Sequence, residues 1–313
     1  MTKAAWRAAW GAAARLPAAF LAVFFAWPAA NLVVQGFRDD GVWTPSGFAA
    51  VFSSARTWRA VGFTLASAGA TTLLCVLLGL PGAHALYRCR FPGRDALRAA
   101  VTVPFVLPTV AVGVAFGALL REDGWLGWLG LDGTPVAIVA AMVFFNYSVV
   151  VRTVGAMWAR LDPRLAQAGA TLGAGPLRVF LTVTLPTLAP AVLSAAALVF
   201  LFSSSSYGIV MVLGHGRFHT VETEIWFLTT QLLDLRGAAA LSVTQLVIVA
   251  LALWATGRAQ AGLTRALTLQ PDVGATRRYD ARRDLPALAA TLATALLLLG
   301  LPLAHLVWRS LHR

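Results

Sequence analysis

Residues 161–190 read LDPRLAQAGATLGAGPLRVFLTVTLPTLAP, a polar-edged, small-residue break between two strongly apolar runs. Asp162 is a good helix N-cap, and Pro163 suits the first helical position because its missing N–H would have no partner there. Gly173 can adopt the left-handed conformation that ends a helix, and Gly175-Pro176 can begin a second helix. The sequence therefore predicts a short helix, a turn and a new helix, which together present a small-residue surface for docking a partner protein.

Outside this break, the composition is typical of a polytopic membrane protein. Of the 313 residues, 58% are hydrophobic and 12% are charged, about half the charged share of a typical soluble chain. Apolar runs long enough to cross a bilayer as helices are expected at 16–37, 60–86, 97–120, 135–158, 187–212, 238–257 and 285–308. The predicted fold class is all-α, with six spans and a seventh after a polar, arginine-rich linker.

Basic residues divide unevenly between the two sides of the expected membrane. Counted in alternate segments between spans, starting with the N-terminus, one side carries 17 of the 25 basic residues and 5 of the 13 acidic residues. Cytoplasmic segments of membrane proteins are enriched in Lys and Arg. The N-terminus and the 159–186 break are therefore expected on the cytoplasmic side of the cell (inner) membrane. Topology accounts for the net charge of +12, so no nucleic-acid partner is predicted.

The last apolar run resembles the first. Trp27-Pro28-Ala29-Ala30-Asn31-Leu32-Val33 and Leu301-Pro302-Leu303-Ala304-His305-Leu306-Val307 match at Pro, Ala, Leu and Val, and each follows a basic segment and a Leu-Pro pair. Internal repeats are common in transporters. We therefore expect a six-span half at 1–262 with its break at 159–186, a cytoplasmic basic linker at 263–284, and the first span of a second, truncated half at 285–313.

The break resembles the cytoplasmic loop of ABC-importer permeases. That loop carries Glu-Ala-Ala, three residues, Gly and, after a spacer, a hydrophobic residue, any residue and Leu-Pro. Here Gln167-Ala168-Gly169, Gly173 and Val183-Thr184-Leu185-Pro186 stand at the same spacing, with Gln167 in place of the acid. The resemblance implies a coupling helix that docks in a cleft of a separate ATPase subunit. The coupling residues it implies are Gln167, Ala168, Gly169, Gly173, Arg178, Leu185 and Pro186.

The resemblance extends over residues 16–262 and implies a six-helix permease core, here followed by a seventh helix that starts a second repeat. The segments 85–94, 143–146, 203–214 and 220–225 resemble the thiamine-type permeases. This likeness implies import of thiamine or a phosphorylated derivative, delivered by an extracytoplasmic binding protein. Ferric iron is the alternative substrate within the same family. A second permease half or a homodimer partner is also implied.

Polar residues and prolines inside the spans are candidates for the translocation path. Ser203-Ser204-Ser205-Ser206-Tyr207 is expected within the fifth span, where hydroxyl groups are costly unless they face protein or water. The run either lines the pore or bonds helices together, and the sequence favours neither. Asn146 either lines the path or bonds across helices, with the second favoured. Pro104 and Pro108 predict a kink in the third span.

No other group of residues predicts an enzyme, a cofactor or a metal site. The expected spans carry no acidic residue of the kind used by ion-coupled carriers, which argues against the alternative of a secondary transporter. No Gly-rich phosphate loop is present, so ATP hydrolysis is assigned to a partner subunit. Cys75 and Cys89 lack metal-ligand spacing. A solvated external loop that contacts the binding protein is expected to hold His215, His219, Glu222 and Glu224.

Overall fold

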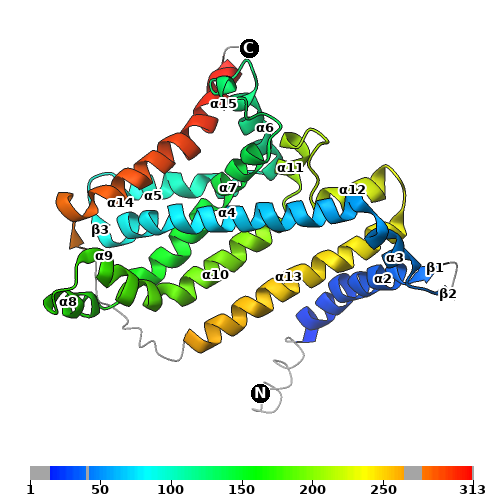
Figure 1. Cartoon of the computed structure of the whole chain (residues 1–313), viewed down its shortest axis with the longest axis horizontal. Coiled ribbons are helices and arrows are strands. Elements are labelled where there is room, and N and C mark those ends of the chain that lie inside the picture. The colour runs from blue at the N-terminus through cyan, green and yellow to red at the C-terminus, as the bar shows by residue number, and fades with distance from the viewer. Residues whose placement is uncertain (1–14, 40–41, 264–276, 312–313) are drawn as a thin grey trace, which may run out of the picture. The chain divides into compact units, whose positions relative to one another are not determined.

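The described chain is almost entirely helical. The computed structural model describes residues 15–39, 42–263 and 277–311. Within them, six helices are long and apolar enough to cross a membrane, or up to seven if a sharply bent pair counts as one span (Figure 1). The six are Arg15–Gly36, Ala55–Arg88, Pro135–Trp158, Pro176–Ser204, Leu235–Ala261 and Asp284–Leu311, and the bent pair joins Arg94–Val106 to Thr109–Leu120. The all-α membrane fold expected from the sequence is confirmed.

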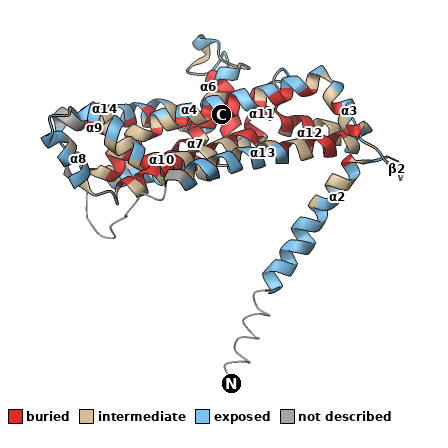
Figure 2. Cartoon of the chain, turned by 60° about the horizontal axis from the view of Figure 1, so that its bottom comes forward, coloured by how far each residue is buried: buried red, intermediate tan, exposed pale blue. Residues whose placement is uncertain are grey.

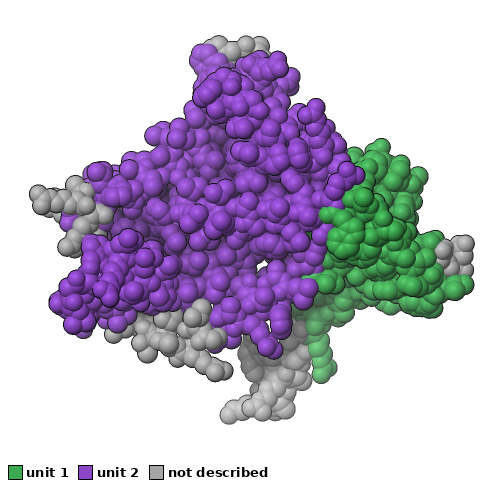
Figure 3. All heavy atoms as spheres, in the orientation of Figure 1, with its two compact units in different colours: residues 1–58, 224–247 green, residues 59–223, 248–313 purple. Residues whose placement is uncertain are grey.

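Two compact units divide the chain, and Figure 3 colours them separately. Unit 1 comprises Met1–Trp58 and Glu224–Val247, and unit 2 comprises Arg59–Thr223 and Ile248–Arg313. The described elements up to the second span are η1 (Ala22–Ala26), α2 (Trp27–Gly36), β1 (Arg38–Asp39), β2 (Val42–Trp43), α3 (Ser46–Ser53) and α4 (Ala55–Arg88). Those up to the central span are β3 (Cys89–Arg90), α5 (Arg94–Thr102), η2 (Val103–Val106), α6 (Thr109–Leu120), η3 (Gly127–Leu129) and α7 (Pro135–Trp158).

The second part of the chain begins with the predicted break. Its elements are α8 (Pro163–Thr171), α9 (Pro176–Val179), η4 (Phe180–Thr184), α10 (Leu185–Ser204), α11 (Gly208–Leu213), α12 (Val221–Thr230) and α13 (Leu235–Leu263). After the residues that the structure does not describe come β4 (Arg277–Arg278), α14 (Ala281–Ala293), η6 (Thr294–Gly300) and α15 (Leu301–Leu311). Most of the expected linker, 264–276, lies outside the described residues.

Unit 1 contains an ion pair between a buried carboxylate and a partly exposed guanidinium. Its α2 leads into an antiparallel hairpin in which Arg38 of β1 pairs with Trp43 of β2. The Glu224 carboxylate of α12 is 5% exposed and lies 2.7 Å from Arg56 Nε, and the Arg56 guanidinium covers the Phe227 ring at 4.0 Å. The prediction of a solvated loop is wrong for Glu224, because the region forms a helix and turns this carboxylate inward.

The neighbouring residues of the same region belong to unit 2. Glu222 is half-buried, and burial raises its pKa because the charged form loses hydration. His215 lies 3.1 Å from Asp132, so it is engaged in a contact within the protein. Neither finding fits a simple solvated loop.

The helix α7 forms the centre of unit 2. Thr134 caps its first turn by accepting a hydrogen bond from the Ala137 N–H at 3.3 Å, and Pro135 takes the first helical position. Most of the helix is buried, as the red ribbon in Figure 2 shows. α4 comes close to it through glycine: a Cβ on Gly79 would lie 2.7 Å from Val150 Cγ1. Such small-residue contacts let membrane helices pack tightly.

The third span is broken where the sequence predicts a kink. The pair Arg94–Val106 and Thr109–Leu120 is bent by 104°. Pro104 lies in the 3-10 turn η2, and Pro108 precedes α6 with an extended ψ of 138°. A proline disfavours the helical conformation of the residue before it, so Leu107 is extended as well, with ψ 141°. The predicted kink is therefore confirmed, and it is a full break.

The fifth span differs from its expected bounds of 187–212. Helical structure begins at Pro176 and ends at Ser204, and Ser205 to Tyr207 separate α10 from the short α11. The serine run therefore lies at the end of a helix and in the break that follows, and the prediction that it lies within the span is wrong. The physical reason is visible in the sequence, because successive hydroxyls compete for backbone hydrogen bonds and favour helix ends.

A π-helical turn precedes each of three prolines in the spans. The turns η1, η4 and η6 end two residues before Pro28, Pro186 and Pro302. Proline lacks an N–H and clashes with the carbonyl four residues earlier, and a wider turn relieves both problems. The first and last spans share this feature, but the fifth span has it too. The π turn is therefore not specific to the first and last spans, and the repeat remains a prediction.

The seventh span packs within unit 2. At one end the Asp284 carboxylate lies 3.0 Å from His84 of α4. At the other end Arg309 lies 3.0 Å from Asp123, and the His305 ring contacts the Trp125 ring at 5.0 Å. α14, η6 and α15 are therefore attached to the six-span core at both ends.

Candidate functional site

The 159–186 loop folds as the sequence predicts. Asp162 Oδ1 accepts a hydrogen bond from the Arg164 N–H at 2.9 Å and so caps α8. Gly173 has a φ of +80°, and the Ala174 N–H donates to the Gly169 carbonyl at 3.2 Å, which closes the end of the helix. Pro176 then begins α9.

The helix α8 packs against the following helix through Gly169. A Cβ on Gly169 would lie 3.3 Å from Val179 Cγ2 and 3.8 Å from Val183 Cγ2. The missing methyl group lets α8 lie close to α9 and η4. From Val179 the chain remains helical through η4 and α10 to Ser204. A displacement of α8 would therefore act directly on a helix that ends at the serine run.

The outer surface of this loop is exposed and largely apolar. No residue of α8 is buried, and Leu172 and Leu177 are 88% and 70% exposed. Of the coupling residues expected from the resemblance, Gln167, Ala168, Gly173, Arg178 and Pro186 are exposed, while Gly169 and Leu185 are half-buried. Exposed apolar side chains rimmed by polar groups mark protein contact surfaces.

A hydrogen bond joins α7 to α10 in the core of unit 2. Asn146 Nδ2 donates to the Met142 carbonyl at 3.0 Å and to Ser203 Oγ at 3.3 Å. Both side chains are buried. The bond across helices expected for Asn146 is therefore present, and Ser203 is its partner. Asn146 Oδ1 and Ser206 Oγ are buried and have no hydrogen-bond partner among the described residues. The amide oxygen could therefore accept a further hydrogen bond, and the hydroxyl could donate or accept one.

The two helix breaks of unit 2 meet at Gly208. A Cβ on Gly208, the first residue of α11, would lie 2.5 Å from Thr109 Oγ1 and 2.6 Å from the Val110 backbone N. Thr109 is the first residue of α6, directly after Pro108. The structure thus brings the proline break and the serine break into direct contact. Gly208 was not among the site residues predicted from the sequence, although its place directly after a polar run was a usable signal.

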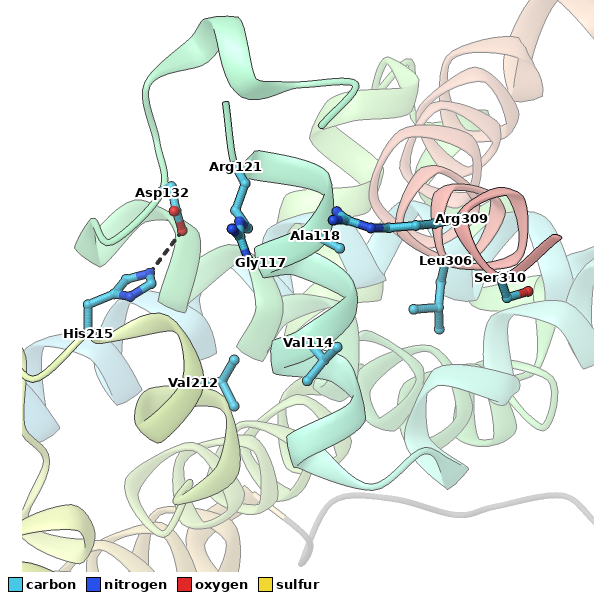
Figure 4. Close-up of a pocket in the computed structure, with 10 residues that line it drawn as sticks. All are labelled: Val114, Gly117, Ala118, Arg121, Asp132, Val212, His215, Leu306, Arg309 and Ser310. Atoms are coloured by element: carbon cyan, nitrogen blue, oxygen red, sulfur yellow. Dashed lines mark hydrogen bonds and ion pairs between the residues drawn. The ribbon is translucent and has the colours of Figure 1, made fainter. Parts of the chain in front are cut away.

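An open cavity of about 360 Å³ lies between α6, α11 and α15 (Figure 4). Its polar side chains make contacts within the protein: His215 lies 3.1 Å from Asp132, and Arg309 and Arg121 lie 3.0 and 3.8 Å from the one carboxylate of Asp123. The rest of the lining is mainly small or apolar, with Val114, Gly117, Ala118, Val212 and Leu306. Both arginines at this cavity are therefore engaged with a carboxylate of the protein.

Broken spans, an exposed helix between spans and a buried hydrogen bond between α7 and α10 are features of membrane transport proteins. The comparison with known families agrees. Residues 75–265 match the family described as binding-protein-dependent transport system inner membrane component. The chain belongs to this family, so it is the membrane-spanning permease subunit of an ABC importer, and its partners are an ATPase and a solute-binding protein.

Several relatives and solved structures are similar to this chain. A probable sulfate transport system permease protein of Nephroselmis olivacea is 33% identical over 65% of this chain and 74% of its own length. The sulfate transport system permease protein of Escherichia coli is 33% identical over 61% and 72%, and the molybdenum transport system permease protein of the same organism is 29% identical over 63% and 90%. The prediction of a thiamine or ferric-iron permease is contradicted, because these relatives are sulfate and molybdenum permeases.

The fold is shared with permease subunits of known structure. A chain of a bacterial alginate ABC transporter, in complex with a periplasmic protein that holds an alginate pentasaccharide, is similar with a TM-score of 0.70 and 17% identity, over 85% of this chain and 99% of its own. A chain of the inward-facing MetNI methionine ABC transporter is similar with a TM-score of 0.55 and 19% identity, over 66% and 95%. At these identities the likeness extends to the fold alone.

Proposed function

We propose that the chain couples ATP-driven movement of α8 to opening of a path for a tetrahedral oxyanion, sulfate or molybdate. The observation that carries the coupling is the contact of Gly169 with Val179, followed by uninterrupted helix to Ser204. Closure of an ATPase cleft around α8 would displace this helix along with it. The displacement would reach the Asn146–Ser203 hydrogen bond and the neighbouring break.

The exposed loop surface supports docking by shape. Leu172 and Leu177 offer apolar area, and the exposed Gln167 stands where the family usually has an acid. A glutamine can donate and accept hydrogen bonds but carries no charge. Gln167 therefore contributes packing and neutral hydrogen bonds to docking, and any dependence on salt concentration is expected to come from the exposed Arg164 and Arg178.

The proposed path begins where the two breaks meet. Neutral hydroxyl donors suit the passage of an oxyanion, because a fixed cation in a low-dielectric site would bind the anion strongly and slow its release. The buried Ser206 hydroxyl and the Asn146–Ser203 pair are among the neutral polar groups near the break after α10. Pro104 and Pro108 would position the broken third span along the path.

The choice of sulfate or molybdate is supported by the sulfate and molybdenum permeases among the relatives. The two anions share charge and tetrahedral shape, so one neutral path can serve either. The uneven distribution of arginines supports an orientation with the N-terminus and α8 in the cytoplasm. A complete pore would also require a second permease half or subunit.

Uptake by proteoliposomes that contain the chain, its ATPase and its binding protein tests this proposal. ATP-dependent uptake of radiolabelled sulfate is expected, with competition by molybdate and no competition by thiamine. Co-purification of the ATPase without uptake of either oxyanion would reject the substrate but keep the coupling. Uptake that continues in the absence of any ATPase would reject the coupling itself.

A further inference from the structure

Three potential metal ligands meet where α4 ends and α14 begins. His84, Cys89 and Asp284 each offer one ligand atom, and these atoms lie within 4.8 Å of one another. His84 Nε2 is 3.0 Å from Asp284 Oδ1 and 3.8 Å from Cys89 Sγ. Cys89 and Asp284 are each 1% exposed. In Figure 1, β3 and α14 lie at the same end of unit 2 as α8 and α9.

Backbone pairing holds the cluster together. Cys89 of β3 pairs in parallel with Arg277 of β4, and the Tyr279 N–H donates to the Arg90 carbonyl at 3.3 Å. The chain that precedes α14 is thereby fastened to the end of α4. Because the two segments are 200 residues apart, sequence spacing gave no sign of the cluster.

Neighbouring groups orient two of the three side chains. The Asp280 N–H donates to Asp284 Oδ2 at 3.0 Å, which leaves Oδ1 directed at His84. The Trp158 ring packs against the His84 ring with a centroid separation of 5.2 Å. Partners of this kind fix the orientation of ligands in metal sites.

The geometry distinguishes a shared ion from a catalytic relay. In a Cys–His–Asp relay the two nitrogens of the imidazole serve different partners, one the nucleophile and the other the carboxylate. Here the same nitrogen, His84 Nε2, faces both Cys89 Sγ and Asp284 Oδ1. Three ligand atoms that converge on one point are what a single bound cation requires.

We propose that His84, Cys89 and Asp284 form a Zn²⁺ site that clips the start of α14 to the end of α4. Zinc bonds of about 2.0–2.3 Å at a tetrahedral angle place ligand atoms roughly 3.3–3.6 Å apart. The observed distances from His84 Nε2, 3.0 Å to Asp284 Oδ1 and 3.8 Å to Cys89 Sγ, bracket these values. A shift of one side chain by about 1 Å would bring the third pair, Cys89 Sγ and Asp284 Oδ1, into the same range. A thiolate and a carboxylate neutralise Zn²⁺, which favours the ion in a buried site. The fourth position is left for water.

Arg88 lies at the end of α4, directly before Cys89. Its guanidinium donates to the Trp158 and Leu161 carbonyls at 3.4 and 3.3 Å, so it is engaged with the end of α7. The mixed nitrogen, sulfur and oxygen ligands favour zinc over magnesium or calcium, which prefer oxygen ligands alone.

Cobalt substitution in the purified full chain, with any affinity tag removed, tests the site. Titration of the reduced protein with Co²⁺ is expected to give a sulfur-to-cobalt charge-transfer band that saturates at one ion per chain and disappears when Zn²⁺ is added. Cys89→Ser is expected to abolish the band and to weaken binding by at least the roughly 10–100-fold that loss of an outer-shell partner costs. Cys75→Ser is the matched control, since Cys75 lies inside α4 and outside the cluster, and it should leave both unchanged.

Other outcomes overturn the proposal. These are absence of the band in the wild-type chain, a band that persists in Cys89→Ser, or a band that is lost in Cys75→Ser. Asp284→Asn provides a second measurement in case Cys89→Ser does not fold. It keeps the thiolate band but should weaken Co²⁺ binding by at least about tenfold, and unchanged binding would show that the cluster is an ordinary ion pair beside a thiol.

Discussion

Replacing Gly173 with alanine isolates the backbone conformation that ends α8. Gly173 has a φ of +80°, and a Cβ built there meets no atom within 4 Å. The substitution therefore introduces no clash, and its cost is the left-handed conformation alone, about 1–2 kcal/mol for a residue other than glycine. α8 has nine residues, none of them buried, and helices this short are marginal by themselves. The conformational cost of the alanine should therefore directly lower the fraction of molecules in which this loop is folded.

A titration of the purified permease with its ATPase subunit measures this effect. A cost of 1–2 kcal/mol corresponds to a roughly 5–30-fold lower population, and the apparent affinity for the ATPase should fall by a similar factor. Gly173→Asn should fall between the wild type and Gly173→Ala, because asparagine tolerates the left-handed region better than alanine.

Gly175→Ala is the matched control two residues away. Gly175 has a φ of −65° and also has no atom within 4 Å of a Cβ, so the same chemical change lacks the conformational cost. Equal affinities of the two alanine variants would refute the reasoning. An unchanged affinity of Gly173→Val would show that this loop does not bind the ATPase.

Three further substitutions test the interior, each measured by thermal unfolding in detergent. Gly208→Ala is expected to cost about 1–3 kcal/mol and to slow uptake, because its Cβ would lie 2.6 Å from the Val110 N. Ser203→Ala should cost about 1 kcal/mol, since the Asn146 amide loses one acceptor. Arg56→Met should cost about 3 kcal/mol, the low end for a buried pair, because Arg56 is 38% exposed and the Glu224 carboxylate stays buried.

Two of these predictions have a matched control. Gly117→Ala on α6 should be tolerated, because its Cβ would make an ordinary 3.6 Å contact with Leu213. Glu224→Gln added to Arg56→Met should recover most of the lost stability, since it removes the unpaired charge. A stable Gly208→Ala variant with normal uptake would show that the contact of the two breaks is not part of the mechanism.

Local rules in the sequence predicted the elements that depend on near neighbours. Asp162, Pro163, Gly173 and Pro176 define the ends of α8 and α9, because caps, proline and left-handed glycine act within a few residues. The bounds of α7 also agree with the expected 135–158. The end of α10 was placed wrongly, since hydropathy favours continuing the span while four hydroxyls favour ending it.

The substrate could not be read from these local rules. The resemblance to thiamine permeases rested on short segments such as 85–94 and 143–146, which lie at the end of α4 and within the largely buried α7. Gln167 and the spacing from Asp162 to Pro186 carry the resemblance to the permease class. They carry no information on the solute, which passes elsewhere.

By itself the sequence determined that this chain is a helical membrane protein, because apolar length, Pro and Gly positions and the distribution of arginines act locally or along one span. Only the tertiary structure decided which distant residues meet. It joined Asn146 to Ser203, set Gly208 against Thr109, and brought Asp284 to His84 across 200 residues. The physical reason is that these contacts depend on how whole helices approach one another, and that approach depends on side-chain volumes on several helices at once.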